Sequence, residues 1–287
     1  MKKVNRMSKK KTMINNLVVV SDLHCGCQMG LCPPEGVKLD GGGMYYPSDA
    51  QINVWNRWCE FWDEWIPDAT KGEPFSVVVN GDALDGVHHG SVHQITHNLA
   101  DQSEIARQLL APIVDVCEGR FYGIRGTEAH VGPSGQEEEK LYRQLGAIPD
   151  SNGNYARWEL WKRVGKGLVH ITHHIGSTGS TAYESSALMR EITESYVDCG
   201  RWNQEPPDVI IRSHRHRAIE IRLATGKGEA TVATTAGWQL KTPFVFKIPG
   251  GRQTQPQLGG LLVRDGERET YTLNKVWSVK RPDPEIS

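Results

Sequence analysis

Five short segments place Asp and His side chains just after apolar, strand-like runs, and this recurrence constrains the fold more than any other sequence feature. They are Ser21-Asp22-Leu23-His24, Gly81-Asp82-Ala83-Leu84-Asp85, Arg125-Gly126-Thr127-Glu128-Ala129-His130, Thr172-His173-His174 and Ser213-His214-Arg215-His216. Because the loops that follow rigid strands open at one edge of an α/β sheet, side chains from distant parts of the chain can meet there. The pattern predicts an α/β fold with a site at that edge.

The side chains in these segments combine carboxylates with imidazoles, a set that suits manganese, iron or zinc. In an extended chain alternate residues share a face, so Asp22 and His24 point the same way. The same holds for His214 and His216. Asp82 lies between these pairs in the sequence and can bridge two ions with its two carboxylate oxygens. We therefore expect the pairs to close on one centre.

Composition sets the broad class of the protein. With 38% hydrophobic residues among 287, most of the chain can bury a core. No apolar run reaches the roughly 20 residues of a membrane helix, and no secretory signal pattern is present, so a cytoplasmic location without membrane contact is expected.

Residues 1–11 hold six Lys or Arg, whereas the rest carries 27 basic and 34 acidic residues. We expect residues 1–14 to form a flexible, solvated basic tail, with nucleic-acid binding as the alternative. Residues 15–287 are expected to form a single domain with a strand-rich C-terminal part.

Hydrophobic periodicity and turn residues predict alternating strands and helices, followed by paired strands. The expected strands cover residues 17–21, 75–79, 120–124, 156–162, 168–173, 208–212, 219–223, 229–234, 260–263 and 269–273. The expected helices cover residues 49–66, 99–117, 136–145 and 182–197. Ser48 and Gln51 form a capping-box pattern at the start of the first helix, and Pro67 is expected to end it. Together these elements predict a mixed α/β sandwich. The segment 235–258, rich in Gly, Gln and Pro, is either a lid or a plain surface loop.

Two further groups of residues have alternative interpretations. Four tryptophans share one face of the first helix, namely Trp55, Trp58, Trp62 and Trp65. Core packing is favoured over base stacking. Three cysteines, Cys25, Cys27 and Cys32, lie close together, but no second pair accompanies them, so reduced thiols are favoured over a zinc site. The histidines that follow the second motif are expected to lie in loops near the site, and His170 to be structural.

The five segments resemble the motif series of the calcineurin-like metallophosphoesterases: Asp-x-His, Gly-Asp-x-x-Asp, Gly-Asn-His, a lone His, and Gly-His-x-His. The resemblance spans about residues 17–217 and implies a four-layer α/β/β/α sandwich. It also implies two divalent ions, with manganese favoured and iron, zinc or nickel as alternatives. The implied ligands of the first ion are Asp22, His24, Asp82 and His216. The implied ligands of the second are Asp82, His214 and either His173 or His174, of which His173 is favoured. Asp85 is expected to organise the loop.

The third motif departs from the family pattern. The usual Gly-Asn-His is replaced by Gly126-Thr127-Glu128, with His130 two positions later, a segment similar to the Gly-Thr-x-x-His of some phage-type members. Thr127 offers only a hydroxyl, and Glu128 is an alternative ligand. If the loop bulges to bring His130 in, this residue is the candidate general acid and, with Asp82, a catalytic residue.

The resemblance implies a phosphoesterase in which hydroxide held between two metal ions attacks phosphorus. A phosphodiester is favoured as substrate, with a nucleotide or nucleic acid as the class. The candidate substrate-binding residues are Arg125, Arg215, His89 and Thr127, although either arginine could instead face solvent. The alternative is a non-catalytic binding or scaffold protein with an incomplete metal site. The sequence leaves the oligomeric state open.

Overall fold

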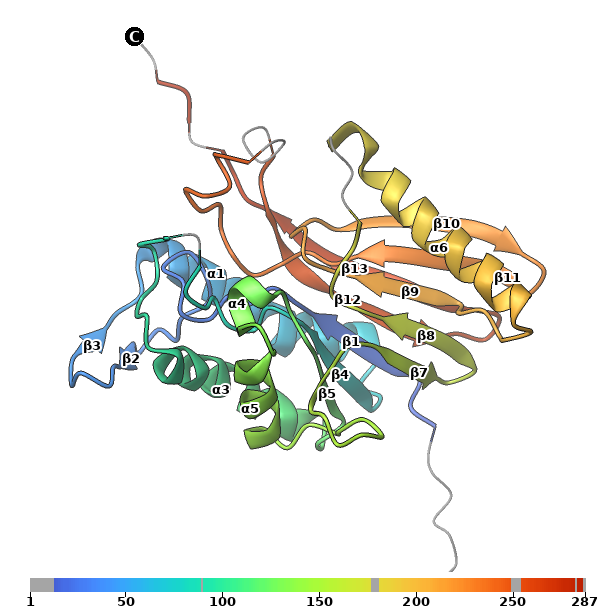
Figure 1. Ribbon diagram of the computed structural model, residues 1–287, viewed down its shortest axis with the longest axis horizontal. Coiled ribbons are helices and arrows are strands. Elements are labelled where there is room, and N and C mark those ends of the chain that lie inside the picture. Colours follow the sequence, from blue (N-terminus) through green and yellow to red (C-terminus); the bar gives the residue numbers. More distant parts are fainter. Residues whose placement is uncertain (1–12, 89, 177–180, 249–253, 282, 286–287) are drawn as a thin grey trace, which may run out of the picture.

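The computed structural model describes residues 13–88, 90–176, 181–248, 254–281 and 283–285, and two sheets packed face to face form its centre (Figure 1). The first sheet has the strand order β13-β12-β1-β4-β5-β6. Its strands are β1 (Asn16–Val20), β4 (Phe75–Asn80), β5 (Phe121–Ile124), β6 (Ala156–Arg157), β12 (Gln257–Asp265) and β13 (Thr270–Ser278). The four strands from β1 to β6 are parallel, whereas β12 and β13 pair antiparallel, as the expected hairpin requires. Every residue of β1 and β4 is buried, which explains their uninterrupted apolar runs.

The second sheet has the order β10-β11-β9-β8-β7. Its strands are β7 (Leu160–Val164), β8 (Gly167–Ile171), β9 (Val209–Arg212), β10 (Ile219–Thr225) and β11 (Gly228–Thr234). The central strands β8, β9 and β11 are parallel to one another, and β7 and β10 close the edges as antiparallel hairpin partners. A separate small ribbon joins β2 (Val37–Lys38) to β3 (Met44–Tyr45).

Helices cover the outer faces of both sheets. They are α1 (Asp49–Cys59), the π-helix η1 (Glu60–Trp65), α2 (Ile66–Thr70), α3 (Leu99–Val116), α4 (Glu128–Val131), α5 (Gln136–Gln144), the 3₁₀ turn η2 (Thr181–Tyr183) and α6 (Glu184–Arg201). One apolar core lies between the sheets and contains Val19 and Ile211. A second core joins the first sheet to α1, α3 and α5, and a third joins the second sheet to α6 through Leu188. The layers are therefore α/β/β/α, as the resemblance implied (Figure 1).

Two predicted elements differ in the structure. Pro67 does not end the first helix, because the π-helical stretch Glu60–Trp65 precedes it and Pro67 occupies the first turn of α2, where a missing N–H is tolerated. Instead the helix ends at Lys71, which adopts a left-handed backbone. The single strand expected over residues 156–162 is also wrong, since β6 belongs to the first sheet and β7 to the second. The chain crosses between the sheets at residues 158–159.

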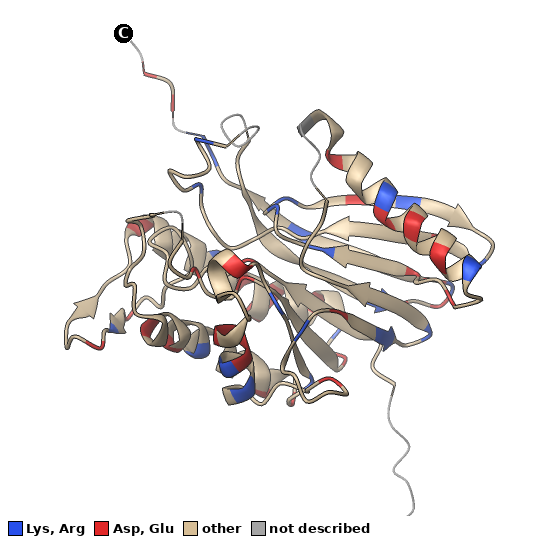
Figure 2. Cartoon of the chain, viewed as in Figure 1, with Lys and Arg blue, Asp and Glu red and all other residues tan. Residues whose placement is uncertain are grey.

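The tryptophan face of the first helix packs into the core. Trp58 is buried and meets Trp238 edge-to-face, with 4.8 Å between ring centroids. Trp55, Trp62 and Trp65 pack partly buried against the same core, which confirms the packing interpretation. The predicted capping box of Ser48 and Gln51 is also present. Charged residues of both signs are interspersed along α5 and α6 (Figure 2).

Candidate metal centre

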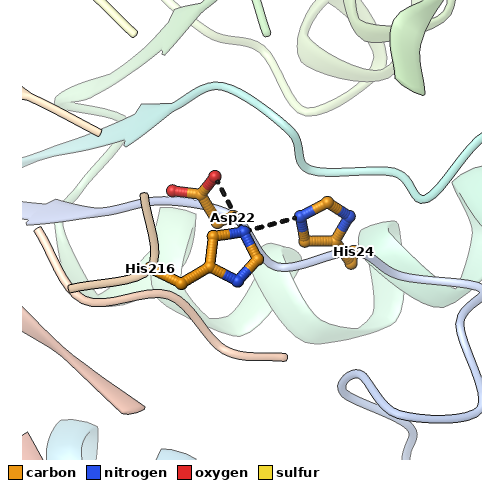
Figure 3. Close-up of side chains that lie close together, drawn as sticks. All are labelled: Asp22, His24 and His216. Atoms are coloured by element: carbon orange, nitrogen blue, oxygen red, sulfur yellow. Dashed lines mark hydrogen bonds and ion pairs between the residues drawn. The ribbon is translucent and has the colours of Figure 1, made fainter. Parts of the chain in front are cut away.

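The first ligand group gathers residues from the two ends of the α/β region. Asp22 and His24 follow β1, and His216 follows β9. The Nε2 atom of His216 lies 3.3 Å from Asp22 Oδ1 and 3.1 Å from His24 Nε2 (Figure 3). Around a tetrahedral ion with bonds of ~2.0–2.1 Å, ligand atoms lie roughly 3.3 Å apart. Apart from this contact with His216, Asp22 Oδ1 is buried without a hydrogen-bond donor within the described part of the chain. The spacing and this unsatisfied oxygen both fit a divalent cation.

The second group consists of Asp82, His173 and His214, whose ligand atoms all lie within 4.8 Å of one another. His173 Nε2 lies 3.1 Å from Asp82 Oδ2. The other ring nitrogen, Nδ1, donates to the carbonyl of Asn80 at 2.6 Å. Because a carbonyl only accepts, this bond places a proton on Nδ1 and turns Nε2 toward the site, where a bound cation would replace the proton of Nε2. His174 is exposed and belongs to neither group.

Five of these six candidate ligands have a left-handed backbone. They are Asp22, His24, Asp82, His214 and His216, with φ between 45° and 73°. This conformation is uncommon for residues other than glycine and costs free energy, so it persists where the surrounding structure enforces it. The loops at the strand ends are thus bent to turn these side chains toward one place. Gly126 is equally constrained, since a Cβ there would lie 2.1 Å from Asp82 Oδ1.

Asp85 supports the first group from behind. Its Oδ1 contacts His24 Nδ1 at 3.2 Å, which leaves His24 Nε2 facing the site. Gln94 and Gln239 donate to the two oxygens of Asp85 at 3.0 and 3.2 Å. The carboxylate is therefore held by groups from two other loops. Asp85 lies where the sequence suggested a loop-organising residue.

The third motif forms a turn of helix, α4, rather than a bulge. Thr127 donates to Asp82 Oδ1 through its backbone N–H at 2.7 Å and through its hydroxyl at 3.1 Å. His130 lies one turn later, its ligand atom grouped with those of His24 and Asp82. Its Nδ1 donates to the carbonyl of Asp85 at 2.6 Å. Glu128 belongs to none of the candidate ligand groups found among the described residues.

Electrostatics in the site couple buried carboxylates to imidazoles. Burial alone would raise the pKa of Asp82, but His173 and His130 hold that pKa well below its usual range. Conversely, burial opposes protonation of His173, yet the Asp82 carboxylate raises the pKa of His173 to about 10. Burial and then His24 lower the pKa of His130 to about 4. The two carboxylates Asp22 and Asp82 are therefore ionised at neutral pH, as metal ligands must be.

Glu138 on α5 is a site residue that the sequence did not single out. It is fully buried, and its carboxylate accepts the backbone N–H of Ala83 at 2.9 Å and that of Gly126 at 2.6 Å. Burial and then the nearby Asp82 raise the pKa of Glu138 to about 7. The run of acids 137–139 resembles a solvated face, but the spacing of Glu138 to Leu141 and Tyr142 matches one buried face of a helix.

A buried network of hydroxyl groups also ties the strand ends together. Thr235 Oγ1 lies 2.6 Å from the hydroxyl of Ser21 and 2.8 Å from that of Ser213. Asn80 donates to Ser213 Oγ at 2.6 Å. Ser213 stands where the family pattern has glycine, and its hydroxyl has a structural use here.

A cleft of about 640 Å³ opens over the site. Its lining includes His24, Asp82, Thr127, His130, His214, Arg215 and His216. Arg215 donates to the carbonyls of Glu184 and Gly176, so its guanidinium is held in the wall. Arg125 does not line the cleft: it packs over the ring of Trp158 at 4.6 Å. His89 lies outside the described residues.

The remaining histidines and the cysteines lie outside the two candidate ligand groups. His88 and His93 line the cleft, as expected of loop histidines near the site. His170 stacks on Trp161, with 4.0 Å between ring centroids, and has no part in the ligand groups. The described cysteines have free thiols, and none joins a candidate ligand group. Within the described residues, no helix has both the length and the apolar character needed to cross a membrane.

Comparisons with known proteins found distant likenesses among solved structures. No family model and no curated protein match the chain. Similar solved structures include an uncharacterised predicted phosphoesterase from Streptococcus pneumoniae, with 12% identity over 92% of this chain and 98% of that one, and a TM-score of 0.32. Vacuolar protein sorting 29 from Cryptosporidium parvum matches with 10% identity over 93% and 100% of the two chains, at a TM-score of 0.33. The sulfate thiohydrolase SoxB from Thermus thermophilus matches with 12% identity over 92% and 56%, at a TM-score of 0.38.

These likenesses are too distant to carry an inference about activity or substrate. The structure itself has the layer order α/β/β/α and two groups of candidate Asp and His ligands beside one cleft. In these two respects the chain resembles the calcineurin-like metallophosphoesterases.

Proposed function

We propose that this protein is a metal-dependent phosphoesterase that binds two divalent cations, with Asp82 shared between them. The observation that carries the proposal is the convergence of Asp22, His24 and His216 with Asp82, His173 and His214 at one cleft. Two carboxylates and four imidazoles, four of which line the cleft while Asp22 and His173 are buried beside it, suit manganese, with iron, zinc or nickel as alternatives. Hydrolysis of a phosphodiester, such as a nucleotide or a nucleic acid, is favoured within this class.

Two bound cations would supply Lewis acidity to the phosphoryl oxygens and lower the pKa of water to near 7. The residues of the chain prepare the site for this. Asn80 and Asp85 orient His173 and His24, so the ligand nitrogens need no rearrangement. Thr127 holds the Asp82 carboxylate in place. Arg215, fixed in the cleft wall, contributes positive charge for an anionic ester.

His130 is the proposed general acid, because it lines the cleft beside the ligands. Its pKa of about 4 means that the ring is neutral at pH 7 without substrate. Proton donation from Nε2 requires this pKa to rise; the negative charge of a bound phosphate ester acts in that direction, whereas bound cations would oppose it.

The test is hydrolysis of bis(p-nitrophenyl) phosphate with added manganese, together with the metal content of the purified protein. We expect the unmodified chain to hydrolyse the ester and to contain about two ions per chain. We expect Asp82→Asn to lose both the turnover and the bound metal. The control Asp150→Asn removes a carboxylate from an exposed turn, and we expect it to keep the turnover and the bound metal. Turnover in Asp82→Asn equal to the unmodified chain would overturn the mechanism.

One observation favours a second candidate, a non-catalytic binding or scaffold protein. Thr127 takes the place of an amide ligand, and both its hydroxyl and its N–H are directed to Asp82. The second ion therefore has only three protein ligands here. One ion or none per chain, without turnover, would favour this candidate over the enzyme.

A further inference from the structure

One wall of the cleft consists of the candidate metal ligands and the arginines beside them, and the wall facing it carries apolar side chains. This apolar wall comes from the segment between β11 and β12, which contributes six apolar and five polar residues to the cleft lining. The apolar residues, which form the wall, are Leu240, Pro243, Phe244, Val245, Ile248 and Pro256. Phe244 and Ile248 are each 36% exposed, so their side chains reach into the open cleft instead of filling a core. Residues 235–239 of this segment are buried, whereas the described residues 240–248 and 254–256 border the open cleft.

This wall is anchored to the metal ligands at both of its ends. Before the wall, the N–H of Trp238 donates to the carbonyl of Asp22 at 2.9 Å. After it, the N–H of Gln257 donates to the carbonyl of His216 at 2.9 Å. Lys241 donates to the carbonyl of Thr254 at 2.9 Å and so joins the two arms of the segment. The wall therefore has a fixed place relative to the first ligand group.

The charges around the wall indicate what kind of molecule fits. Arg215 and Arg217 line the cleft, but Arg217 is paired with Glu184 at 2.8 Å and Arg215 is held by carbonyls. Among the described residues of this segment, Lys241 is the one cation that lines the cleft, since Lys247 is not a lining residue. A long polyanion needs a continuous row of cations along its path, and a row of apolar side chains does not provide one. A small anion with an apolar group attached matches both walls.

We infer that the wall binds the organic substituent of a small phosphate ester, an aromatic or branched apolar group bonded through oxygen to the phosphorus that the metal ligands hold. This inference rests on the proposed function and narrows its substrate class. Any ester held at the ligands must direct its substituents into the same cleft. When that substituent packs against the wall, apolar surface of both is removed from water, and this removal favours binding.

The test compares two non-hydrolysable probes, phenylphosphonate and methylphosphonate, by calorimetry on the manganese-loaded full chain. We expect phenylphosphonate to bind about tenfold more tightly. In Phe244→Ser and in Ile248→Ser this preference is expected to fall to threefold or less, while the affinity for methylphosphonate stays unchanged. Val92→Ser is the matched control, because Val92 lies on another loop, is 77% exposed and is not among the residues lining the cleft.

Two results would overturn the inference. One is equal affinity for both probes in the unmodified chain, and the other is a preference that neither wall variant reduces. Thermal unfolding of the variants identifies a misfolded chain, and Val245→Ser then serves as the replacement test of the wall. Turnover of bis(p-nitrophenyl) phosphate is measured separately, so absent turnover with a retained phenyl preference would reject the proposed catalysis and leave the wall assignment standing.

Discussion

Glu138 is predicted to hold together the two loops that surround Asp82. In Glu138→Gln the side chain keeps its volume, but one of the two backbone N–H groups, of Ala83 or Gly126, must face an amide NH₂ and loses its acceptor. A buried donor left without an acceptor costs about 1–3 kcal/mol. We expect the free energy of unfolding to fall by that amount. We also expect weaker manganese binding, because Ala83 and Gly126 flank Asp82 and Thr127.

Urea unfolding of the metal-free protein measures the first effect, and manganese titration by calorimetry measures the second. Glu137→Gln is the matched control, since it removes a negative charge from the same helix where the carboxylate pairs with Lys140 at the surface. Exposed pairs of this kind contribute about 0–1 kcal/mol. Equal stability and equal manganese affinity in the two variants would refute the positioning role of Glu138.

Two further predictions concern the second ligand group. The pKa of His173 is about 10 in the folded, metal-free chain and ~6.5 in the unfolded chain, so the native state binds more protons between these two pH values. The free energy of unfolding should therefore fall as pH rises through this range, by up to ~1.4 kcal/mol per pH unit. Urea unfolding in EDTA between pH 6.5 and 8 checks this, and an unchanged slope in His173→Gln would contradict it. Thr127→Val loses the hydroxyl bond to Asp82 and should cost about 1–2 kcal/mol in the same assay, whereas Thr127→Ser keeps it. Equal losses in the two variants would show that the hydroxyl is not what matters.

Local patterns in the sequence predicted much of the fold and the candidate ligands. Asp22, His24, His214 and His216 were identifiable because short motifs follow apolar strands, and such strands end at one edge of a sheet. The capping box at Ser48 was predictable for the same reason, since it involves residues three apart.

What the sequence did not predict depends on contacts between distant segments. Pro67 continues a helix because a π-helical stretch precedes it, and a proline by itself indicates an end. The strand expected over residues 156–162 divides between two sheets, which a pattern of alternation cannot express. The role of Glu138 depends on donors 55 and 12 residues away in the chain.

The left-handed backbone at Asp22, His24, Asp82, His214 and His216 has a consequence for how this chain can change. Each such residue costs ~1–2 kcal/mol relative to an ordinary conformation, and glycine would remove that cost. A lineage selected for thermal robustness alone would therefore gain by exchanging these side chains for glycine and would lose the candidate ligands in doing so. The chain retains side chains that oppose its own stability, which is the trade-off typical of a site maintained for chemistry.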